Sequence, residues 1–250
     1  MPTKFQLFDL YSLRARFFPA VLALLALGGL VILFSDSILK SVPNAASFTV
    51  VFAAVGYLLA NIVRHRGKTY EDSFLARTGG WQTTVLLRHG DETIDHVTKS
   101  RYHRALEDLS GMLLPTMEEE NTSHEDADSA YRSATKVLIE RRRGSEFSIL
   151  HAENAAYGFW RNLTAIKPIA LVLAILAVAI IIAALVVHGT TGASWTTFLS
   201  SMFSNRRGVE ALAYEIVYII VLLLIVSDHA VLVSARTYAE ALFRTLDVGS

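Results

Sequence analysis

The chain has 250 residues, of which 52% are apolar and 18% are charged, and its 23 basic residues balance its 23 acidic ones. This composition is too apolar and too poor in charge for an ordinary soluble domain, and zero net charge gives no overall attraction to nucleic acid. The absence of cysteine excludes disulfides, thiolate catalysis and cysteine-ligated metal centres. Any chemistry must therefore come from histidine, carboxylate, hydroxyl or backbone groups.

Apolar residues are concentrated in four long runs, each close to the roughly 20 residues that an α-helix needs to cross a bilayer core. The runs are 17–34, 48–63, 168–187 and 212–233. In the first run, Gly28 and Gly29 allow either close contact with another helix or local bending. Short loops join the runs in pairs. We therefore expect an all-α membrane protein with four transmembrane helices in two hairpins and a mainly helical cytoplasmic insert.

Basic residues gather on one side of these four spans. Because cytoplasmic segments of membrane proteins carry the excess of Lys and Arg, both termini and the insert should face the cytoplasm of a bacterial inner membrane. Only Lys40, Arg206 and Arg207 lie on the opposite side, and the adjacent arginines argue weakly against this orientation. The residues on the cytoplasmic side are Lys4, Arg14, Arg16, Arg64, Arg66, Lys68, Arg161, Lys167, Arg236 and Arg244.

This topology predicts four segments. The first hairpin occupies 1–64, a cytoplasmic helical domain 65–166, the second hairpin 167–234, and a cytoplasmic amphipathic helix 235–250. The last helix has one apolar face, so it should extend the fourth span and complete the cytoplasmic bundle.

The insert itself should contain three helices. Apolar residues at helical spacing predict a helix over 98–114, which Pro115 ends. Ser123 is a plausible N-cap for a second helix that reaches about Arg142, with acidic residues in its first turn. A third helix at 147–163 should lead into the membrane.

The segment 82–88 is rich in Thr, Val and Leu and could form a short strand. Arg88-His89-Gly90 ends it, and this tripeptide is similar to the start of histidine phosphatases, in which the His takes the phosphoryl group and the Arg binds its oxygens. Those enzymes need a larger α/β domain with a second His and Arg. The main alternative is a loop in which the Arg and His side chains are solvated. A hydrolase that uses His89 is the enzymatic interpretation.

Histidines and carboxylates between 89 and 107 also suggest a metal site, and His103 and Glu107 form an i,i+4 pair. No recognised metal spacing appears, so a surface pair is the default and we expect neither a metal nor another cofactor. The acidic triplet 118–120 is interpreted as a solvated charge run rather than a cation site.

Three ionisable residues, Glu215, Asp228 and His229, lie in the fourth apolar run. Such residues within a membrane usually face the interior of a helix bundle or a water path. We expect Glu215 near the outer end, within reach of Arg206 and Arg207, and the other two near the cytoplasmic end. A pore role and a structural or interfacial role are the alternatives.

A dense polar set precedes the third span. On a helix, several of its members share one face and form a hydrogen-bonding stripe that docks the insert on the spans or binds a partner. The set is Glu153, Asn154, Tyr157, Arg161 and Asn162.

Several short motifs occur across the insert and the start of the third span. They are Lys99 with Arg101-Tyr102-His103, Leu114-Pro115-Thr116 before the Glu triplet, Ala127-Asp128 with Tyr131, Glu153-Asn154, Tyr157-Gly158-Phe159, Arg161-Asn162 and Lys167-Pro168. In these motifs the chain resembles an uncharacterised group of bacterial inner-membrane proteins with four spans and a cytoplasmic helical insert. The resemblance implies that the protein lies in a bacterial inner membrane, and it implies no known reaction. Trp160 and Thr164 depart from the basic and the small residue expected there.

The sequence favours a non-enzymatic, homo-oligomeric membrane protein whose cytoplasmic domain receives a signal or a protein partner and acts through its spans. Four spans are too few to enclose a typical substrate path alone, so a pore requires an oligomer. A channel-like stress or anti-phage (antiviral defence) effector is one concrete version. A membrane scaffold that anchors a soluble partner is an alternative. The lipid bilayer is the expected environment, and nucleic acid is not an expected partner.

Overall fold

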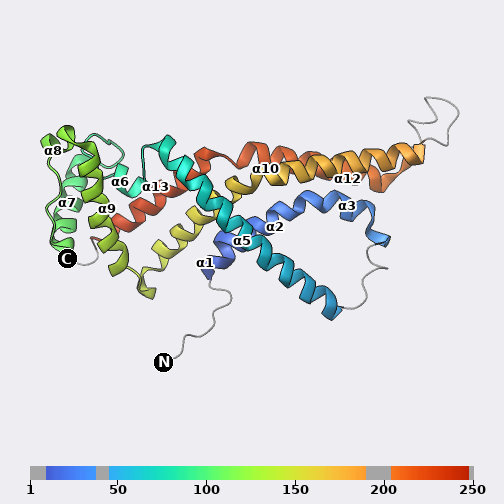
Figure 1. Cartoon of the computed structure of the whole chain (residues 1–250), viewed down its shortest axis with the longest axis horizontal. Coiled ribbons are helices and arrows are strands. Elements are labelled where there is room, and N and C mark those ends of the chain that lie inside the picture. The colour runs from blue at the N-terminus through green and yellow to red at the C-terminus, as the bar shows by residue number, and fades with distance from the viewer. Residues whose placement is uncertain (1–9, 38–44, 190–203, 248–250) are drawn as a thin grey trace. The chain divides into compact units, whose positions relative to one another are not determined.

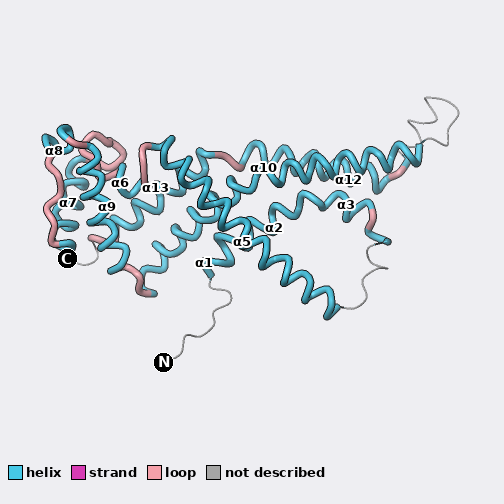
Figure 2. The backbone as a smooth tube through the Cα atoms, viewed as in Figure 1, coloured by secondary structure: helices cyan, strands magenta, loops and turns pink. Residues whose placement is uncertain are grey.

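The computed structural model describes residues 10–37, 45–189 and 204–247, and every regular element within these ranges is a helix (Figure 2). Two compact units share these residues. The membrane unit comprises Met1–Thr69 and Phe159–Ser227, and the bundle unit comprises Tyr70–Gly158 and Asp228–Ser250. The boundaries fall within two long helices and at one helix junction. These helices are α5 (Ala45–Thr78), α10 (Ser148–Gly189), and α12 (Arg206–Ile225) followed by α13 (Asp228–Arg244) (Figure 1).

Among the described residues, three helical segments are long and apolar enough to cross a membrane, which indicates a membrane protein. They are Leu13–Leu33, Ser145–Val187 and Arg206–Ile225. The predicted span at 48–63 lies within α5, and the side chains of its first residues lie outside the described set. The predicted loops around Lys40 and at 190–203, and the N-terminal Lys4, also lie outside the described residues.

The first span is not one regular α-helix. It consists of α1 (Leu10–Ser12), the π-helical turn η1 (Leu13–Phe17), α2 (Phe18–Leu24), the 3-10 turn η2 (Leu25–Leu27) and α3 (Gly28–Leu33). Pro19 explains part of this irregularity, because proline has no N–H to donate to the carbonyl of Ala15, four residues before it. The side chain of Asn162 supplies the missing donor, and its Nδ2 lies 2.5 Å from the Ala15 oxygen.

Small side chains allow the helices of the membrane unit to pack closely. Ala20 and Ala23 from α2 share one buried cluster with Ala170 from α10 and Leu222 from α12. Further along, α12 lies beside α3, and Ala211 packs with residues of α10 and α3 (Figure 1). Small residues let helix backbones approach where a hydrophobic driving force between helices is weak.

The fourth apolar run is divided by a break. The helix α12 ends at Ile225, Val226 has extended backbone (ψ 105°), and α13 begins at Asp228. The Nζ of Lys167 donates to the carbonyl oxygen of Val226 at 2.6 Å, so the break has a partner within the membrane unit. The expectation of one helix running through 212–233 is therefore wrong.

The predicted strand at 82–88 is also wrong, because Gln82–Val85 forms the short helix α6. The backbone N–H of Val85 donates to the carbonyl of Trp81 at 2.9 Å. A lone strand would leave its backbone groups unpaired, whereas one helical turn satisfies them locally.

The bundle unit also contains α7 (His96–Ser110), α8 (Met117–Thr122), α9 (His124–Arg141) and the 3-10 turn η3 (Ser145–Phe147). Ser123 caps α9 as predicted, and its hydroxyl accepts from the N–H of Asp126. The helix α7 ends earlier than expected, because Gly111 adopts left-handed backbone (φ 69°) before Pro115 is reached.

The core of the bundle unit combines the insert with the C-terminal helix. Leu106 of α7 and Tyr131 and Leu138 of α9 are fully buried in one cluster with Leu242 and Phe243 of α13. The apolar face predicted for 235–250 is thus buried against the insert. The unit draws its core from segments about a hundred positions apart in sequence, so local helices alone do not define it.

Candidate functional site

Glu215 lies in the middle of α12 and is fully buried. Its Oε1 accepts a hydrogen bond from the backbone N–H of Gly29 at 2.9 Å. Its Oε2 is buried and has no hydrogen-bond partner among the described residues. Glu215 therefore presents one anchored and one unpartnered oxygen inside a segment long and apolar enough to cross a membrane.

The 3-10 turn in the first span makes the Gly29 N–H available. In a regular α-helix this N–H would donate to the carbonyl of Leu25. In the observed turn, the N–H of Gly28 donates to Leu25 instead, in the shorter i→i+3 pattern. The side chain of Glu215 accepts from the Gly29 N–H. The irregular backbone thus supplies a donor for the buried carboxyl, and the carboxyl supplies an acceptor for the released N–H.

Two tyrosines of α12 hold the same irregular stretch. The hydroxyl of Tyr214 donates to the carbonyl of Leu25 at 2.9 Å, and that of Tyr218 donates to the carbonyl of Leu22 at 3.0 Å. Their rings stack with centroids 6.4 Å apart. In a span, backbone groups released by a break must find partners in neighbouring helices.

Glycine at position 29 is required by this contact. A Cβ there would lie 2.7 Å from Oε1 of Glu215 and 2.8 Å from the carbonyl oxygen of Ala211. A Cβ on Gly28 would lie 2.4 Å from the ring of Tyr214. Of the two predictions for the glycine pair, close helix contact is confirmed.

We call Glu215, Gly29, Tyr214 and Tyr218 the intramembrane cluster. A carboxyl group at such a position can bind and release a proton, or accept a hydrogen bond or a cation at its second oxygen. Ionisable groups are rare in spans because a buried charge is expensive, and they mark ion or proton paths when present. The cluster is therefore the strongest functional candidate in the membrane unit.

The other expected contacts of Glu215 are not formed. Arg206 pairs with Glu210 at 2.7 Å, and Arg207 forms an ion pair with Asp36. The expectation that these arginines reach Glu215 is wrong, because Glu215 lies at mid-helix and turns inward, whereas the arginines are exposed at the end of α12.

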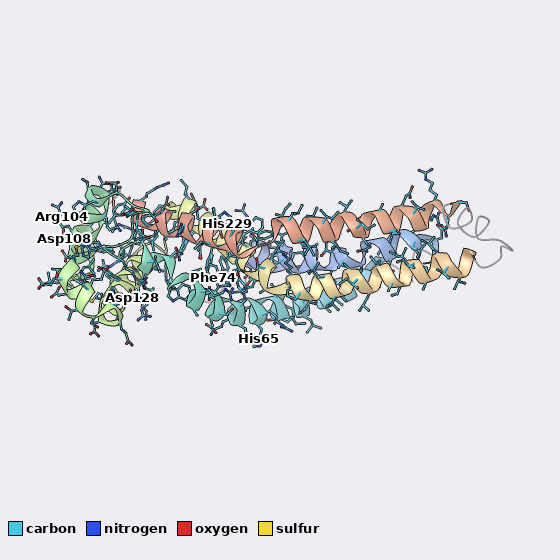
Figure 3. The ribbon with its side chains drawn as sticks, turned by 90° about the horizontal axis from the view of Figure 1, so that it is seen from above. His65, Phe74, Arg104, Asp108, Asp128 and His229 are labelled. Atoms are coloured by element: carbon cyan, nitrogen blue, oxygen red, sulfur yellow. The ribbon has the colours of Figure 1, made fainter. Side chains whose placement is uncertain are left out.

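The structure places Asp228 and His229 in the bundle unit, beyond the end of α12. Asp228 accepts from the hydroxyl of Tyr70 at 2.6 Å and from Arg77 at 3.0 Å. His229, labelled in Figure 3, is exposed. Burial, together with the carboxylate of Asp228, raises the pKa of Tyr70, so the phenol stays protonated and donates.

The five polar residues before the third span are divided between the two units. Tyr157 donates to Glu71 at 2.7 Å within the bundle unit. In the membrane unit, Asn162 is fully buried and accepts from the Nε of Arg161 at 3.3 Å, besides donating to Ala15. Glu153 and Asn154 are half-buried members of the bundle unit. Tyr157, Arg161 and Asn162 therefore each form a hydrogen bond within their own unit.

The Arg88-His89 pair is used structurally in the bundle unit. The guanidinium of Arg88 makes a bidentate contact with Asp128, which is labelled in Figure 3, at 2.8 and 2.6 Å. The Nε2 of His89 lies 2.9 Å from the carbonyl oxygen of Pro115. A short helix and a turn thus replace the predicted strand before these two residues, and both side chains have hydrogen-bond partners in the bundle unit.

Sequence reasoning missed the role of Glu120, which was grouped with its solvated neighbours. Glu120 is 5% exposed and accepts from the N–H of His89 at 3.0 Å and from the hydroxyl of Tyr131 at 2.7 Å. Burial and this carboxylate raise the pKa of Tyr131. The three successive acidic residues lie in the short helix α8, whose geometry turns one of them, Glu120, inward.

A pocket of about 280 Å³ in the bundle unit is lined by His89, His96, His103 and Lys99, among others. Lys99 is buried, and its Nζ donates to the carbonyls of Arg88 and Asp91. Burial lowers the pKa of Lys99. No group of three or more metal-ligating side chains occurs in the described part of the chain.

No protein-family model matches this sequence, and comparisons with curated proteins and with solved structures likewise found no match.

Proposed function

We propose that the protein is an oligomeric integral membrane protein of the bacterial inner membrane that forms a channel-like, membrane-permeabilising assembly. In this proposal α5 is a fourth span, the spans form two hairpins, and both termini face the cytoplasm. The bundle unit receives a signal or protein partner and acts through the spans, as expected of a stress or anti-phage effector.

The intramembrane cluster is the observation that carries this proposal. Oε2 of the fully buried Glu215 has no hydrogen-bond partner among the described residues, so it adds nothing to stability, because an unsatisfied buried polar atom costs about 1–3 kcal/mol. Its position against a broken helix is typical of sites that bind ions or protons in membranes. The proposal includes oligomerisation, because four spans are too few to enclose a typical substrate path alone.

The excess of basic residues on one side of the spans supports the proposed orientation. Arg206 and Arg207 were the one observation against it, and both pair with carboxylates, Glu210 and Asp36. These pairs do not remove the two arginines from the count, because orientation depends on Lys and Arg rather than on net charge, but the two are outnumbered by the basic residues of the other side. The cytoplasmic side keeps the excess of basic residues that sets orientation.

Flux measurements on the full chain test the proposal. The protein is purified in detergent, its subunit number is determined by native mass spectrometry, and it is reconstituted into liposomes that report proton and potassium flux. We expect a closed oligomer whose flux falls at least tenfold in Glu215→Gln. Glu210→Gln is the matched control, since Glu210 lies on the same helix but is exposed, and it should retain flux.

A monomer, or a tight oligomer that conducts nothing, would contradict the channel proposal. That outcome would leave the scaffold interpretation, in which the spans only anchor a bundle unit that binds a soluble partner. Equal flux in wild type and Glu215→Gln would remove the cluster from the conduction path.

A further inference from the structure

The membrane unit carries basic residues at both ends, but its described ion pairs with carboxylates lie at only one end. The unit contains four acidic residues, Asp9, Asp36, Glu210 and Glu215. Asp36 and Glu210 pair with the arginines at the start of α12, and Glu215 binds Gly29, while Asp9 lies outside the described residues. Among the described residues of this unit, no carboxylate is left for the basic residues at the other end.

Two of those basic residues, Arg16 and Arg64, line one small pocket. Its volume is about 100 Å³. Its lining combines the two guanidinium groups with polar and aromatic side chains and with two small residues that keep it open. The remaining lining residues are Ser12, Phe17, Gly56, Tyr57, Ala60 and Asn61. The pocket is too small for a drug-sized ligand, which needs about 300 Å³ or more, and suits a single anionic group.

Local contacts orient these polar groups. The Nη1 of Arg16 lies 3.4 Å from the hydroxyl oxygen of Ser12, and its guanidinium carbon lies 5.7 Å from the centroid of the Tyr11 ring. These contacts hold the arginine side chain, and no ion pair between it and a carboxylate occurs among the described residues. Asn61 donates to the carbonyl of Tyr57 at 2.9 Å, and Arg64 is exposed one turn further along α5.

The surface next to the pocket is apolar. On α5, Tyr57 is 63% exposed, Leu58 62% and Ile62 47%, and the basic residues Arg64, Arg66 and Lys68 follow directly. An exposed apolar surface that gives way to basic residues is the pattern of a helix passing from acyl chains to headgroups. A soluble anion would leave this apolar surface exposed, whereas a lipid would cover it with its acyl chains.

We propose that this pocket binds the phosphate of an anionic glycerophospholipid, with Arg16 and Arg64 as its charge partners. Guanidinium groups match phosphate oxygens in geometry and form strong charge-assisted hydrogen bonds. The inference rests on the proposed four-span arrangement, because α5 must cross the membrane for Arg64 to lie at headgroup depth. The test of this inference measures lipid binding. Its outcome is therefore independent of the ion-flux measurement that tests the channel proposal.

Native mass spectrometry of the full chain tests the proposal, with phosphatidylglycerol titrated into the detergent-solubilised protein. We expect Arg64→Gln and Arg16→Gln each to weaken binding of the first lipid at least fivefold. Arg66→Gln is the matched control, because it removes an exposed charge from the same stretch of α5 without altering the pocket, and it should change binding less than twofold. Arg64→Lys should recover part of the affinity, because it restores the charge but not the planar donor geometry.

Equal losses in Arg64→Gln and Arg66→Gln would overturn the proposal and leave general electrostatic attraction. Displacement of the lipid by millimolar inorganic phosphate would overturn it too, since the site would then serve a soluble anion. Circular dichroism verifies that the variants keep their helicity, and Arg64, being exposed, can be replaced without disturbing the fold.

Discussion

Glu120 in the bundle unit and Glu215 in the membrane unit are both buried, but their hydrogen bonding differs. Glu120 in the bundle unit accepts from a backbone N–H and from a tyrosine hydroxyl, and each of its oxygens has a partner. Glu215 in the membrane unit has one donor for one oxygen and none among the described residues for the other. Both side chains are almost completely buried.

The difference separates a structural carboxylate from a functional candidate. A fully satisfied buried network fixes one packing arrangement and contributes to specificity of the fold. A half-satisfied one lowers stability, and native proteins keep such groups mainly where function uses them. The comparison therefore predicts that equivalent substitutions at the two glutamates have opposite profiles.

The largest effect should follow Glu120→Gln. Both carboxylate oxygens accept from the N–H of His89, so the amide NH2 group would face this donor whichever way it turns. This clash and the loss of the charged hydrogen bonds should destabilise the protein by roughly 3 kcal/mol. Denaturant unfolding in detergent, followed by tryptophan fluorescence, measures this change. Glu118→Gln, at an exposed neighbour, should change stability by less than about 0.5 kcal/mol.

Glu215→Gln is the corresponding change in the membrane unit. It should leave stability within about 1 kcal/mol of wild type, because the second oxygen of Glu215 has no partner among the described residues. A large destabilisation by Glu215→Gln, or none by Glu120→Gln, would abolish the contrast between the two units.

The next effect concerns close helix approach in the membrane unit. Gly29→Ala would bring a methyl group within 3 Å of Glu215 and of the Ala211 carbonyl, and such overpacking should destabilise the protein by about 2 kcal/mol. Thermal unfolding in detergent measures it. Gly90→Ala in the bundle unit is the control, because a Cβ there meets nothing within 4 Å. Similar effects at the two glycines would contradict a specific contact between α3 and α12.

The smallest effect is a pH dependence confined to the bundle unit. Burial lowers the pKa of His103 below its usual 6.5, opposed by its hydrogen bond to the carbonyl of Leu87 at 2.8 Å. The unfolded chain then binds this proton more readily than the folded one, so the contribution of His103 is complete above pH 6.5 and declines as the pH falls through the depressed pKa. Unfolding measured between pH 8 and pH 5 should show this loss, and His103→Gln should reduce the slope. An unchanged slope would show that other titratable groups cause the loss of stability at low pH.

The sequence by itself determined the features that depend on neighbouring residues. The apolar run at 168–187 is long enough to span a bilayer whatever surrounds it, and it lies in α10. The N-cap at Ser123 acts on the first turn of its own helix. The apolar face of 235–250 follows from helical periodicity and is buried as expected.

Only the tertiary structure decided which polar groups meet. Glu215 and Gly29 are 186 positions apart, as Asn162 and Ala15 are 147 apart, and no local pattern links either pair. The irregular turns that expose these backbone groups arise because side chains of other helices replace the lost helical hydrogen bonds. Local composition thus indicated where membrane-spanning helices form, whereas the candidate site exists only where two of them come into contact.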